Sequence, residues 1–495
     1  MKPLRLIDVL RNKIKNSPQS NFLTNIETGK IYSYQDLYET VSSFYSYFSE
    51  MNLKKGSRVI YLANNDWYIF PLIISFSLLD LTIIPINPAL HPNDICRIFE
   101  DVNPDLIISL TKDINIYPTD VPWLDISKIK SKKDLKEKTA KSPSKNPVLV
   151  MYTSGSSGQC KGVMLSEYNI IYGAKSIIDF YKLSSTDRLF CVLPLYHMNA
   201  IMVTGMVPLI AGAEILMSNV FSFTNASLYL ERVKEYKPTI LSLIPSILSV
   251  LMKTESGQDL SALGVNFSFC GAAPLSASLW KQFEKKFNIP VYQGYGLTET
   301  TFWATLTPTD NTKDYNSVGI PYNCDLQIKK EGSEKAGEIV IAGHFVTKGY
   351  LNKNEGFNNS GYFKTGDLGY IGDNGQLYII GRIKDIIIKN GINIYPQSID
   401  DILLKNSSIE DCASLGIDDD ITGEKICTVC VPVEGKNITE LDVKTYAKEN
   451  LSSYMIPDKV LFIKKLPRGA TGKIRKKELI EMVKSELKKK SKNFI

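Results

Sequence analysis

The sequence predicts an α/β protein: a large N-terminal domain of layered, largely parallel sheets with helices, followed by a small α+β domain. Between about residues 30 and 345, apolar runs such as Arg58–Leu62 and Ile83–Ile86 alternate with helix-like stretches such as Ser227–Tyr236. This alternation is typical of parallel sheets whose strands are joined by helices. After Arg382 the pattern changes to a smaller basic segment that ends in a helix-like stretch over residues 476–489.

Length and composition agree with this architecture. The chain has 495 residues, of which 44% are apolar and 22% charged, so it can bury large cores in two or more domains. Its eight cysteines are scattered, which favours a reducing compartment and therefore the cytoplasm. Cys427 and Cys430 form a C-x-x-C, but in a strand, positions three apart point to opposite faces, so we interpret them as core residues. The three histidines are too far apart in sequence to indicate a zinc site.

No membrane-spanning or nucleic-acid-binding segment is expected. The N-terminus lacks the apolar stretch of a secretory signal. The most apolar region, residues 67–90, is interrupted by Pro71, Asp80 and Pro85 before it reaches the ~20 apolar residues of a membrane span, and it predicts a buried helix followed by a strand. The net charge of +6 owes much to a lysine-rich tail at residues 484–492, which is typical of a solvated end.

The strongest local motif is Tyr152–Val163, a run of hydroxyls and glycines that follows an apolar strand-like segment and contains one lysine. Glycines let backbone N–H groups approach an anion, and hydroxyls and an ammonium add donors, so the run predicts a phosphate-binding loop. It lacks the Walker A pattern, which excludes a P-loop NTPase; a flexible linker is the plainer alternative. The predicted phosphate-binding residues are Thr153, Ser154, Gly155, Ser156, Ser157, Gly158 and Lys161.

Six further motifs follow in order, and with the loop they resemble the signature of the adenylate-forming (AMP-binding) superfamily of acyl- and aryl-CoA synthetases, peptide-synthetase adenylation domains and beetle luciferases. The resemblance spans the chain from about residue 70 to Lys473. It implies an adenylation domain over residues 1–382 and a mobile lid over residues 383–495. The motifs are Pro194-Leu-Tyr-His-Met198, Gly271-Ala-Ala-Pro274, Tyr292–Thr300, Thr365-Gly-Asp367, Gly381-Arg-Ile-Lys-Asp385 and Pro467–Lys473.

The resemblance implies a site for ATP and Mg²⁺. The loop with Lys161 would hold the β and γ phosphates, Thr298 would touch the α-phosphate, and Glu299 would bind Mg²⁺, which prefers oxygen ligands. A helix N-cap hydroxyl and a surface carboxylate are the plainer interpretations of Thr298 and Glu299. The nucleoside would lie against Tyr295, which is otherwise a core tyrosine, with its ribose at Asp367, otherwise a turn residue. Small residues beside the base and an arginine at the boundary complete the set: Gly271, Ala272, Ala273 and Arg382.

The lid carries the remaining implied roles. Lys473 would bind the acid and the α-phosphate during adenylation, although a solvated lysine is the plain alternative. Lys384 would be the hinge about which the lid turns, and Gly391 would then line a tunnel for a pantetheine thiol, since glycine admits a narrow chain close to the backbone. Two departures from the family pattern are Cys160, where proline is usual, and Ser398, where glutamate is usual. Neither removes a catalytic group.

The acid pocket is implied next to His197, which would gate between the acid and the thiol tunnel, unless it is a core histidine. Relatives that activate α-amino acids have an aspartate where this chain has Met198, so an acid without an α-amine is favoured. Because glycines leave space, an aromatic or medium-length aliphatic acid is expected to fit better than acetate. The other expected lining residues are Asn199, Gly294, Gly296, Thr301 and Phe302.

The expected activity is therefore ATP-dependent conversion of a carboxylic acid to acyl-AMP, followed by thioester formation with CoA. Loading of a carrier protein's phosphopantetheine arm shares every motif and stays open. A protein that binds the nucleotide without turnover is a third possibility, which the presence of Lys161, Glu299 and Lys473 disfavours. A luciferase-type oxidation has no support in the motifs. The identity of the acid, the thiol acceptor and the oligomeric state are left open by the sequence.

Overall fold

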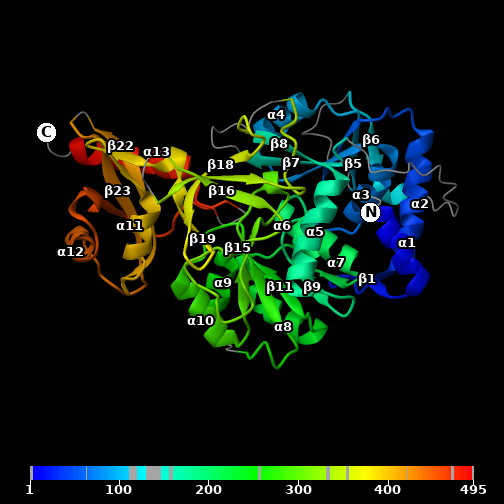
Figure 1. Cartoon of the computed structure of the whole chain (residues 1–495), viewed down its shortest axis with the longest axis horizontal. Helices are drawn as coiled ribbons and strands as arrows, with labels where there is room; N and C mark the ends of the chain where they lie inside the picture. The colour runs from blue at the N-terminus through cyan, green and yellow to red at the C-terminus, as the bar shows by residue number, and fades with distance from the viewer. Residues whose placement is uncertain are drawn as a thin grey trace.

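The computed structural model of the chain describes residues 4–62, 64–110, 120–129, 146–154, 160–254, 258–330, 335–352, 356–419, 421–469 and 473–492. Figure 1 shows a large domain and, beside it, a smaller C-terminal domain coloured orange to red, with the N-terminus on the far side of the large domain. The predicted α/β class with a large and a small domain is confirmed. The charged, proline-containing segment over residues 130–146, whose composition predicts an exposed connection, lies outside the described residues except for Asn146.

Two mainly parallel sheets form most of the large domain. Central strands such as β3 and β4 are buried almost throughout, as expected when both faces of a parallel sheet are covered. The seven-stranded sheet has the order β13 (Val291–Gln293), β12 (Phe267–Cys270), β11 (Ile240–Leu243), β9 (Arg188–Cys191), β10 (Glu214–Met217), β1 (Asn21–Asn25) and β2 (Ile31–Ser33). The six-stranded sheet has the order β6 (Trp123–Asp125), β5 (Leu106–Ser109), β3 (Arg58–Leu62), β4 (Thr82–Ile86), β7 (Leu149–Ser154) and β8 (Cys160–Leu165). Among the strand pairs described in these two sheets, β1–β2 and β7–β8 are antiparallel and the others are parallel.

The helices of the large domain include one that is apolar on every side. This helix, α3 (Ile69–Leu79), buries nine residues, Ile69 to Ser77, and is followed by the buried strand β4, as the sequence predicts for residues 67–90. Within the described part of the chain, no helix has both the length and the apolarity of a membrane span. The other helices are α1 (Leu6–Asn16), α2 (Tyr34–Glu50), α4 (Pro92–Val102), α5 (Glu167–Tyr181), α6 (Met198–Ile201), α7 (Val207–Ala211), α8 (Ala226–Tyr236), α9 (Pro245–Met252) and α10 (Ala277–Phe287).

A smaller antiparallel sheet lies between the parallel sheets and the C-terminal domain (Figure 1). Its last strand ends at Arg382 and leads through a short 3₁₀ turn, η6 (Ile383–Asp385), into the C-terminal domain. The strands are β16 (Asp325–Lys329), β17 (Gly337–Ala342), β18 (Phe363–Ile371) and β19 (Leu377–Arg382), with a separate pair β14 (Thr305–Leu306) and β15 (Ile320–Pro321).

The C-terminal domain packs helices on both faces of one sheet. Cys430 belongs to the apolar cluster on one face and Cys427 to the cluster on the other, so the prediction that they point to opposite faces of a core strand is confirmed. The strands are β20 (Ile387–Lys389), β21 (Ile392–Ile394), β22 (Ile409–Asp419), β23 (Gly423–Pro432) and β24 (Lys459–Phe462). The helices are α11 (Pro396–Leu403), α12 (Glu440–Asn450) and α13 (Lys476–Lys492).

A buried ion pair anchors the N-terminal segment of the chain to α5. Arg5 Nε lies 3.3 Å from Glu167 Oε2, and the two side chains are only 4% and 1% exposed. The same carboxylate accepts a hydrogen bond from the backbone N–H of Leu6 at 2.7 Å, and Arg5 donates to the carbonyl of Ser77 at 2.7 Å. Burial still raises the pKa of Glu167, although Arg5 lowers it. Removal of either Arg5 or Glu167 would therefore leave the other charge buried without a counter-ion.

Replacement of Glu167 by alanine should lower the free energy of unfolding of the large domain by about 3–5 kcal/mol, because Arg5 would stay buried without its counter-ion. Urea titration followed by far-UV circular dichroism measures the change. The matched control is Lys55→Ala, whose partner Asp80 lies 3.1 Å away in a pair with an 81% exposed lysine, and whose loss should cost about 0–1 kcal/mol. Equal effects of the two substitutions would contradict the assignment.

Candidate nucleotide and acid site

The described ends of the predicted phosphate loop belong to the antiparallel strands β7 and β8. Thr153 pairs with Lys161 in the strand register, and Ser154 pairs with Cys160. The hairpin thus brings the predicted hydroxyl and lysine to one end of the six-stranded sheet. The loop residues predicted between them, Gly155, Ser156, Ser157 and Gly158, lie outside the described residues.

Tyr350 contacts both Glu299 and Lys161, the first through its hydroxyl and the second through its ring. The tyrosine hydroxyl donates a hydrogen bond to Glu299 Oε1 at 2.9 Å, and the Lys161 ammonium lies 5.1 Å from the centre of the same ring. Glu299 belongs to the 3₁₀ turn η5 (Thr298–Thr300), and its backbone carbonyl accepts from the N–H of Thr347 at 2.7 Å. Through these two contacts Tyr350 connects the β7–β8 hairpin to the turn that contains Thr298 and Glu299. Sequence reasoning missed Tyr350, which lies outside every motif used.

Asp367 is held between a phenol and a guanidinium. Tyr295 donates to Asp367 Oδ2 at 2.7 Å, and Arg382 Nε lies 2.8 Å from Asp367 Oδ1. The Asp367 side chain is 4% exposed, whereas that of Arg382 is 40% exposed, so the carboxylate is buried behind the guanidinium. Burial raises the pKa of Tyr295 well above its ordinary value, and Asp367 raises it further. The three residues predicted for the nucleoside therefore form one cluster.

The small residues predicted beside the base form the loop after β12. Ala272 has a positive φ of 70°, which is uncommon for a residue with a side chain. A Cβ on Gly271 would lie 3.0 Å from Nε1 of Trp303, so glycine at this position lets the loop approach the indole. Ala273 follows and is partly exposed. Trp303 is a second residue that the sequence interpretation missed, although it directly follows the predicted Phe302.

The Cβ positions of Gly294 and Gly296 are filled by the segment that follows them. A Cβ on Gly294 would lie 2.3 Å from Cδ2 of Trp303, and one on Gly296 would lie 1.7 Å from the carbonyl oxygen of Phe302. The Phe302 and Trp303 rings are stacked with centroids 4.5 Å apart. Glycine at these two positions thus lets the following segment pack closely, and their place in an acid pocket stays a prediction.

Two further predicted acid-pocket residues, Met198 and Asn199, lie at the start of α6. Met198 is 6% exposed, and Asn199 has a buried side-chain oxygen without a hydrogen-bond partner. The helix continues as a π-helical turn, η3 (Met202–Met206), a feature that is frequent at functional sites. Thr301 is fully buried, has a positive φ of 58° and donates to the Phe345 carbonyl, so it is part of the framework of the site.

Lys473 of the C-terminal domain lies within electrostatic range of this cluster. Its side chain is exposed, and partial loss of solvent around the ammonium lowers its pKa. The cations Arg382 and Lys384 lower this pKa further, while the nearby carboxylates of Asp367 and Glu299 raise it. The ammonium also acts on the pKa of His197. These interactions bring together the predicted lysine, nucleoside and metal residues.

The predicted hinge and thiol-tunnel residues differ in their surroundings. Lys384 lies in η6 between the domains, and burial lowers its pKa. The adjacent Asp385 forms a 2.7 Å ion pair with Lys476 at the start of α13, which links the hinge segment to the chain just after Lys473. Gly391 lies at the exposed tip of the β20–β21 hairpin, with open space within 4 Å of its Cβ position. It is therefore not packed against the site in this arrangement of the domains.

His197 should make folding stability fall in mildly acidic solution. Its pKa is lowered from 6.5 to about 4, first by burial and then by the charge of Lys473. Between these values the unfolded chain binds more protons than the folded chain, so stability is complete above the unfolded pKa and is lost as the pH falls toward 4. Urea titrations at several pH values should show this slope, and a His197→Gln variant should lack that part of it. Parallel pH profiles would contradict the assignment.

Comparison with known proteins identifies the family. Residues 10–351 match the model of the AMP-binding enzyme family, and residues 398–473 match that of the AMP-binding enzyme C-terminal domain. A sulfoacetate–CoA ligase of Cupriavidus necator is 33% identical over 344 residues, covering 68% of this chain and 67% of the relative. A 2-succinylbenzoate–CoA ligase of Bacillus cereus is 27% identical over 464 residues, covering 91% and 93%.

The fold has close counterparts among solved structures. ATP-bound MatB from Rhodopseudomonas palustris superposes with a TM-score of 0.87 at 22% identity, covering 97% of this chain and 99% of that one. The family matches and the CoA ligase relatives support the use of ATP and CoA. The chain therefore belongs to the AMP-binding enzyme family, and it is an adenylate-forming acid–thiol ligase of the CoA ligase kind.

Proposed function

We propose that the site described above joins a carboxylic acid to AMP and then transfers the acyl group to the thiol of CoA. The observation that carries the proposal is the cluster in which Tyr295 and Arg382 hold Asp367, with the Lys473 ammonium of the other domain near enough to interact electrostatically with Asp367 and Glu299. A carboxylate is a poor acylating agent because it repels nucleophiles and would expel an oxide. Attachment to AMP corrects both, provided that the acid oxygen is aligned with the α-phosphate and the developing charge is stabilised.

The residues fit a triphosphate. Lys161 and Thr153 lie at the ends of the hairpin that would hold the β and γ phosphates, and Thr298 begins the turn that would meet the α-phosphate. Asp367 would hold the ribose hydroxyls, with Tyr295 and Arg382 fixing its orientation. In this arrangement Lys473 would neutralise charge where the acid and the α-phosphate meet. The adenine would lie near Tyr295 and the loop at Gly271, Ala272 and Ala273.

The residues also fit Mg²⁺ bound mainly through phosphate oxygens. Among the described residues, no group of three or more His, Cys, Asp or Glu side chains is arranged to hold a metal by itself. Glu299 offers one carboxylate, oriented by Tyr350. Mg²⁺ is usually bound by one or two carboxylates together with substrate phosphates and water, so a single oriented carboxylate suffices. The ion would neutralise phosphate charge during adenylation.

We further propose that residues 383–495 turn about Lys384 between the two steps. The present arrangement has Lys473 within electrostatic range of Asp367 and Glu299 and Gly391 in open space, which suits adenylation. An ion pair of 2.6 Å between Lys253 at the end of α9 and Glu410 in β22 also crosses between the domains. Rotation would withdraw Lys473, break this exposed pair at little cost, and bring Gly391 toward the site. His197 would then separate the acyl group from the thiol path.

The acid is proposed to lack an α-amine. Met198 offers no carboxylate for an ammonium group at the start of α6. The unpaired oxygen of Asn199 favours an acid that carries a hydrogen-bond donor, because a buried acceptor without a partner costs about 1–3 kcal/mol. The proposed preference for an aromatic or medium-chain acid is to be tested beside short polar acids. CoA is the proposed acceptor, carrier-protein loading has no support from the relatives, and the cytoplasmic location stays a prediction.

Acid-dependent exchange of labelled pyrophosphate into ATP tests the proposal. The panel should contain aromatic, medium-chain, short hydroxy and dicarboxylic, and α-amino acids. Exchange with one class, followed by CoA consumption, would support both steps. Exchange with α-amino acids alone would overturn the proposed acid class, and measured ATP binding without exchange for any acid would favour a non-catalytic nucleotide-binding protein.

A further inference from the structure

One asparagine joins the carboxyl ends of strands in both parallel sheets. Asn65 lies in the turn between β3 of the six-stranded sheet and α3. Its side chain contacts the segments that leave β9 and β10, which are neighbours in the seven-stranded sheet. Ligands of parallel α/β sheets bind beyond the carboxyl ends of the strands, so this contact lies on the side of the sheets where a bound substrate is expected.

The Asn65 amide uses its donors and its acceptor on three backbone groups. Its Nδ2 donates to the carbonyls of Leu193 at 3.1 Å and Ser218 at 3.2 Å, and its Oδ1 accepts from the N–H of Leu195 at 3.1 Å. Leu193, Leu195 and Ser218 are buried. Aspartate has the same shape as asparagine but only accepts hydrogen bonds when it is ionised, so it could not replace the amide here.

These hydrogen bonds act on the backbone that carries His197. This histidine directly precedes α6, and its N–H donates to the carbonyl of Pro194 at 3.0 Å. Asn65 binds the residues on both sides of Pro194, so the turn that it holds leads directly into His197. The imidazole does not cap α6, and it packs edge-on against Tyr196 with ring centroids 4.9 Å apart. The position of the ring therefore follows from the backbone of residues 193–197.

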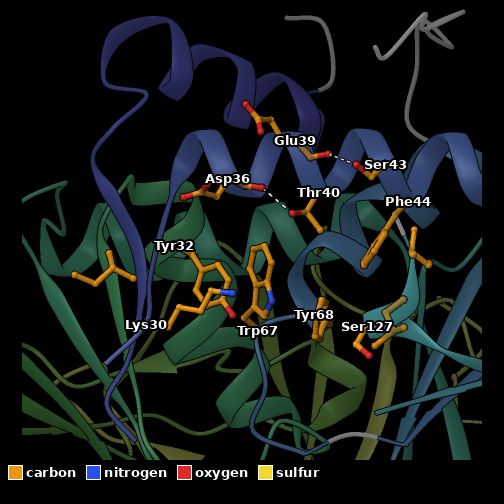
Figure 2. Close-up of a pocket in the computed structure, with 13 residues that line it drawn as sticks. Lys30, Tyr32, Asp36, Glu39, Thr40, Ser43, Phe44, Trp67, Tyr68 and Ser127 are labelled. Carbon is orange, nitrogen blue, oxygen red and sulfur yellow. Dashed lines mark hydrogen bonds between the residues drawn. The ribbon is translucent and has the colours of Figure 1, made fainter. Parts of the chain in front are cut away.

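The turn before α3 is itself fixed by further contacts. Asp66 accepts from the hydroxyl of Tyr61 in β3 and from the N–H of Tyr68 at 2.9 Å. The ring of Trp67 stacks on Tyr32 with centroids 3.9 Å apart. Figure 2 shows Trp67 and Tyr68 in the wall of a cavity of about 290 Å³ beside α2. The asparagine amide therefore extends from a fixed support toward the segment before α6.

We propose that Asn65 is a positioning residue of the ligase reaction, which holds the backbone of residues 193–195 and thereby keeps His197 between the acyl group and the thiol path. The proposal rests on the gating role proposed above for His197. In the step concerned, the CoA sulfur bonds to the acyl carbon, the bond from this carbon to the AMP oxygen breaks, and the thiol proton goes to solvent as AMP leaves. The three partners of Asn65 lie outside the cluster around Asp367, so its loss should leave ATP binding intact.

Two substitutions in the full-length protein test the proposal. Asn65→Ala removes all three hydrogen bonds, and Asn65→Asp keeps the shape and the acceptor but loses both donors. Each should slow thioester formation from supplied acyl-AMP and CoA by about 10²-fold, the loss that follows a misplacement of about 1 Å at a reacting centre. Isothermal titration should show unchanged ATP binding, which establishes that the variants are folded. Asn64→Ala is the matched control, since this neighbour is exposed, and it should retain full activity.

A double-mutant cycle tests whether Asn65 acts through His197. Asn65→Ala should add almost no further loss of thioester formation in a His197→Gln background, because residues that act as a unit are not additive. The same 10²-fold loss in both backgrounds would show that Asn65 acts independently of His197 and would overturn the proposal. Full activity of Asn65→Asp would likewise overturn it, since shape alone would then suffice.

The position of His197 can also be measured without any substrate. The chain has only three histidines, and a His197→Gln variant identifies the imidazole NMR signals of His197. At a pH between about 4 and 6.5 the ring should be neutral in the unmodified protein and become charged in Asn65→Ala, because a displaced ring gains water and its pKa rises toward the ordinary value. An unchanged titration in Asn65→Ala would refute the positioning role. Failure of the unmodified protein to form any thioester would instead contradict the proposed function, and this titration would still decide whether Asn65 positions the ring.

Discussion

Replacement of Lys473 by alanine should reduce acid-dependent pyrophosphate exchange by about 10²–10³-fold, the range observed when one group that stabilises transition-state charge is removed. The ammonium interacts electrostatically with Asp367, Glu299 and His197, and it reaches their neighbourhood because the C-terminal domain places it there. Its withdrawal would leave negative charge on the acid and the α-phosphate unopposed during adenylation. The same substitution should leave thioester formation from supplied acyl-AMP and CoA almost unchanged.

The two half-reactions separate catalysis from structure. Thioester formation is followed with the acyl-AMP of whichever acid supports exchange, in the presence of CoA and without ATP. Lys477→Ala, which removes an exposed lysine four residues further along the chain, is the matched control and should retain both half-reactions. If Lys473→Ala lost both half-reactions equally, the division of labour between the two domain arrangements would be wrong.

Asp367→Asn should weaken ATP binding by about 10–100-fold, because hydrogen bonds to a charged group contribute about 1.5–3 kcal/mol. Asparagine keeps the shape but loses the charge that pairs with Arg382 and orients the Tyr295 hydroxyl. It also replaces one of two acceptor oxygens with a donor, so it cannot accept from both ribose hydroxyls. Isothermal titration with ATP and Mg²⁺ measures the change directly.

Asp373→Asn is the control for this substitution, since Asp373 is exposed in the turn between β18 and β19. It should bind ATP like the unmodified protein. Arg382, the ion-pair partner of Asp367, is 40% exposed, so Asp367→Asn should change the stability of the large domain little. A loss of ATP binding would therefore reflect the nucleotide site and not unfolding. Unchanged affinity in a folded Asp367→Asn protein would remove Asp367 from the nucleotide site.

The motifs predicted which residues meet, but not how they are held. Asp367, Tyr295 and Arg382 stand in three separate motifs and form one cluster, as the resemblance implied. Tyr350, by contrast, contacts Lys161 and Glu299 from a segment without a recognisable pattern, and its partners are set by folding across long sequence distances.

Two further features needed coordinates for the same reason. A glycine in a sequence shows that a side chain is absent and not what fills the space, so the indole of Trp303 beside Gly294 could not be foreseen. The cavity at Trp67 arises between α2 and the segments before α3 and after β6. No local pattern marks a surface that forms only when distant segments pack together.

The ion pair between Arg5 and Glu167 also bears on how the chain folds as the ribosome makes it. The partners are 162 residues apart, so at about 5–20 residues per second the arginine waits roughly 10–30 s for its carboxylate. During that interval Arg5, which directly precedes α1, cannot form its buried ion pair with Glu167. We therefore expect α1 to dock only after α5 has been synthesised. Until then the nascent chain would expose the apolar surface of α1 to chaperones.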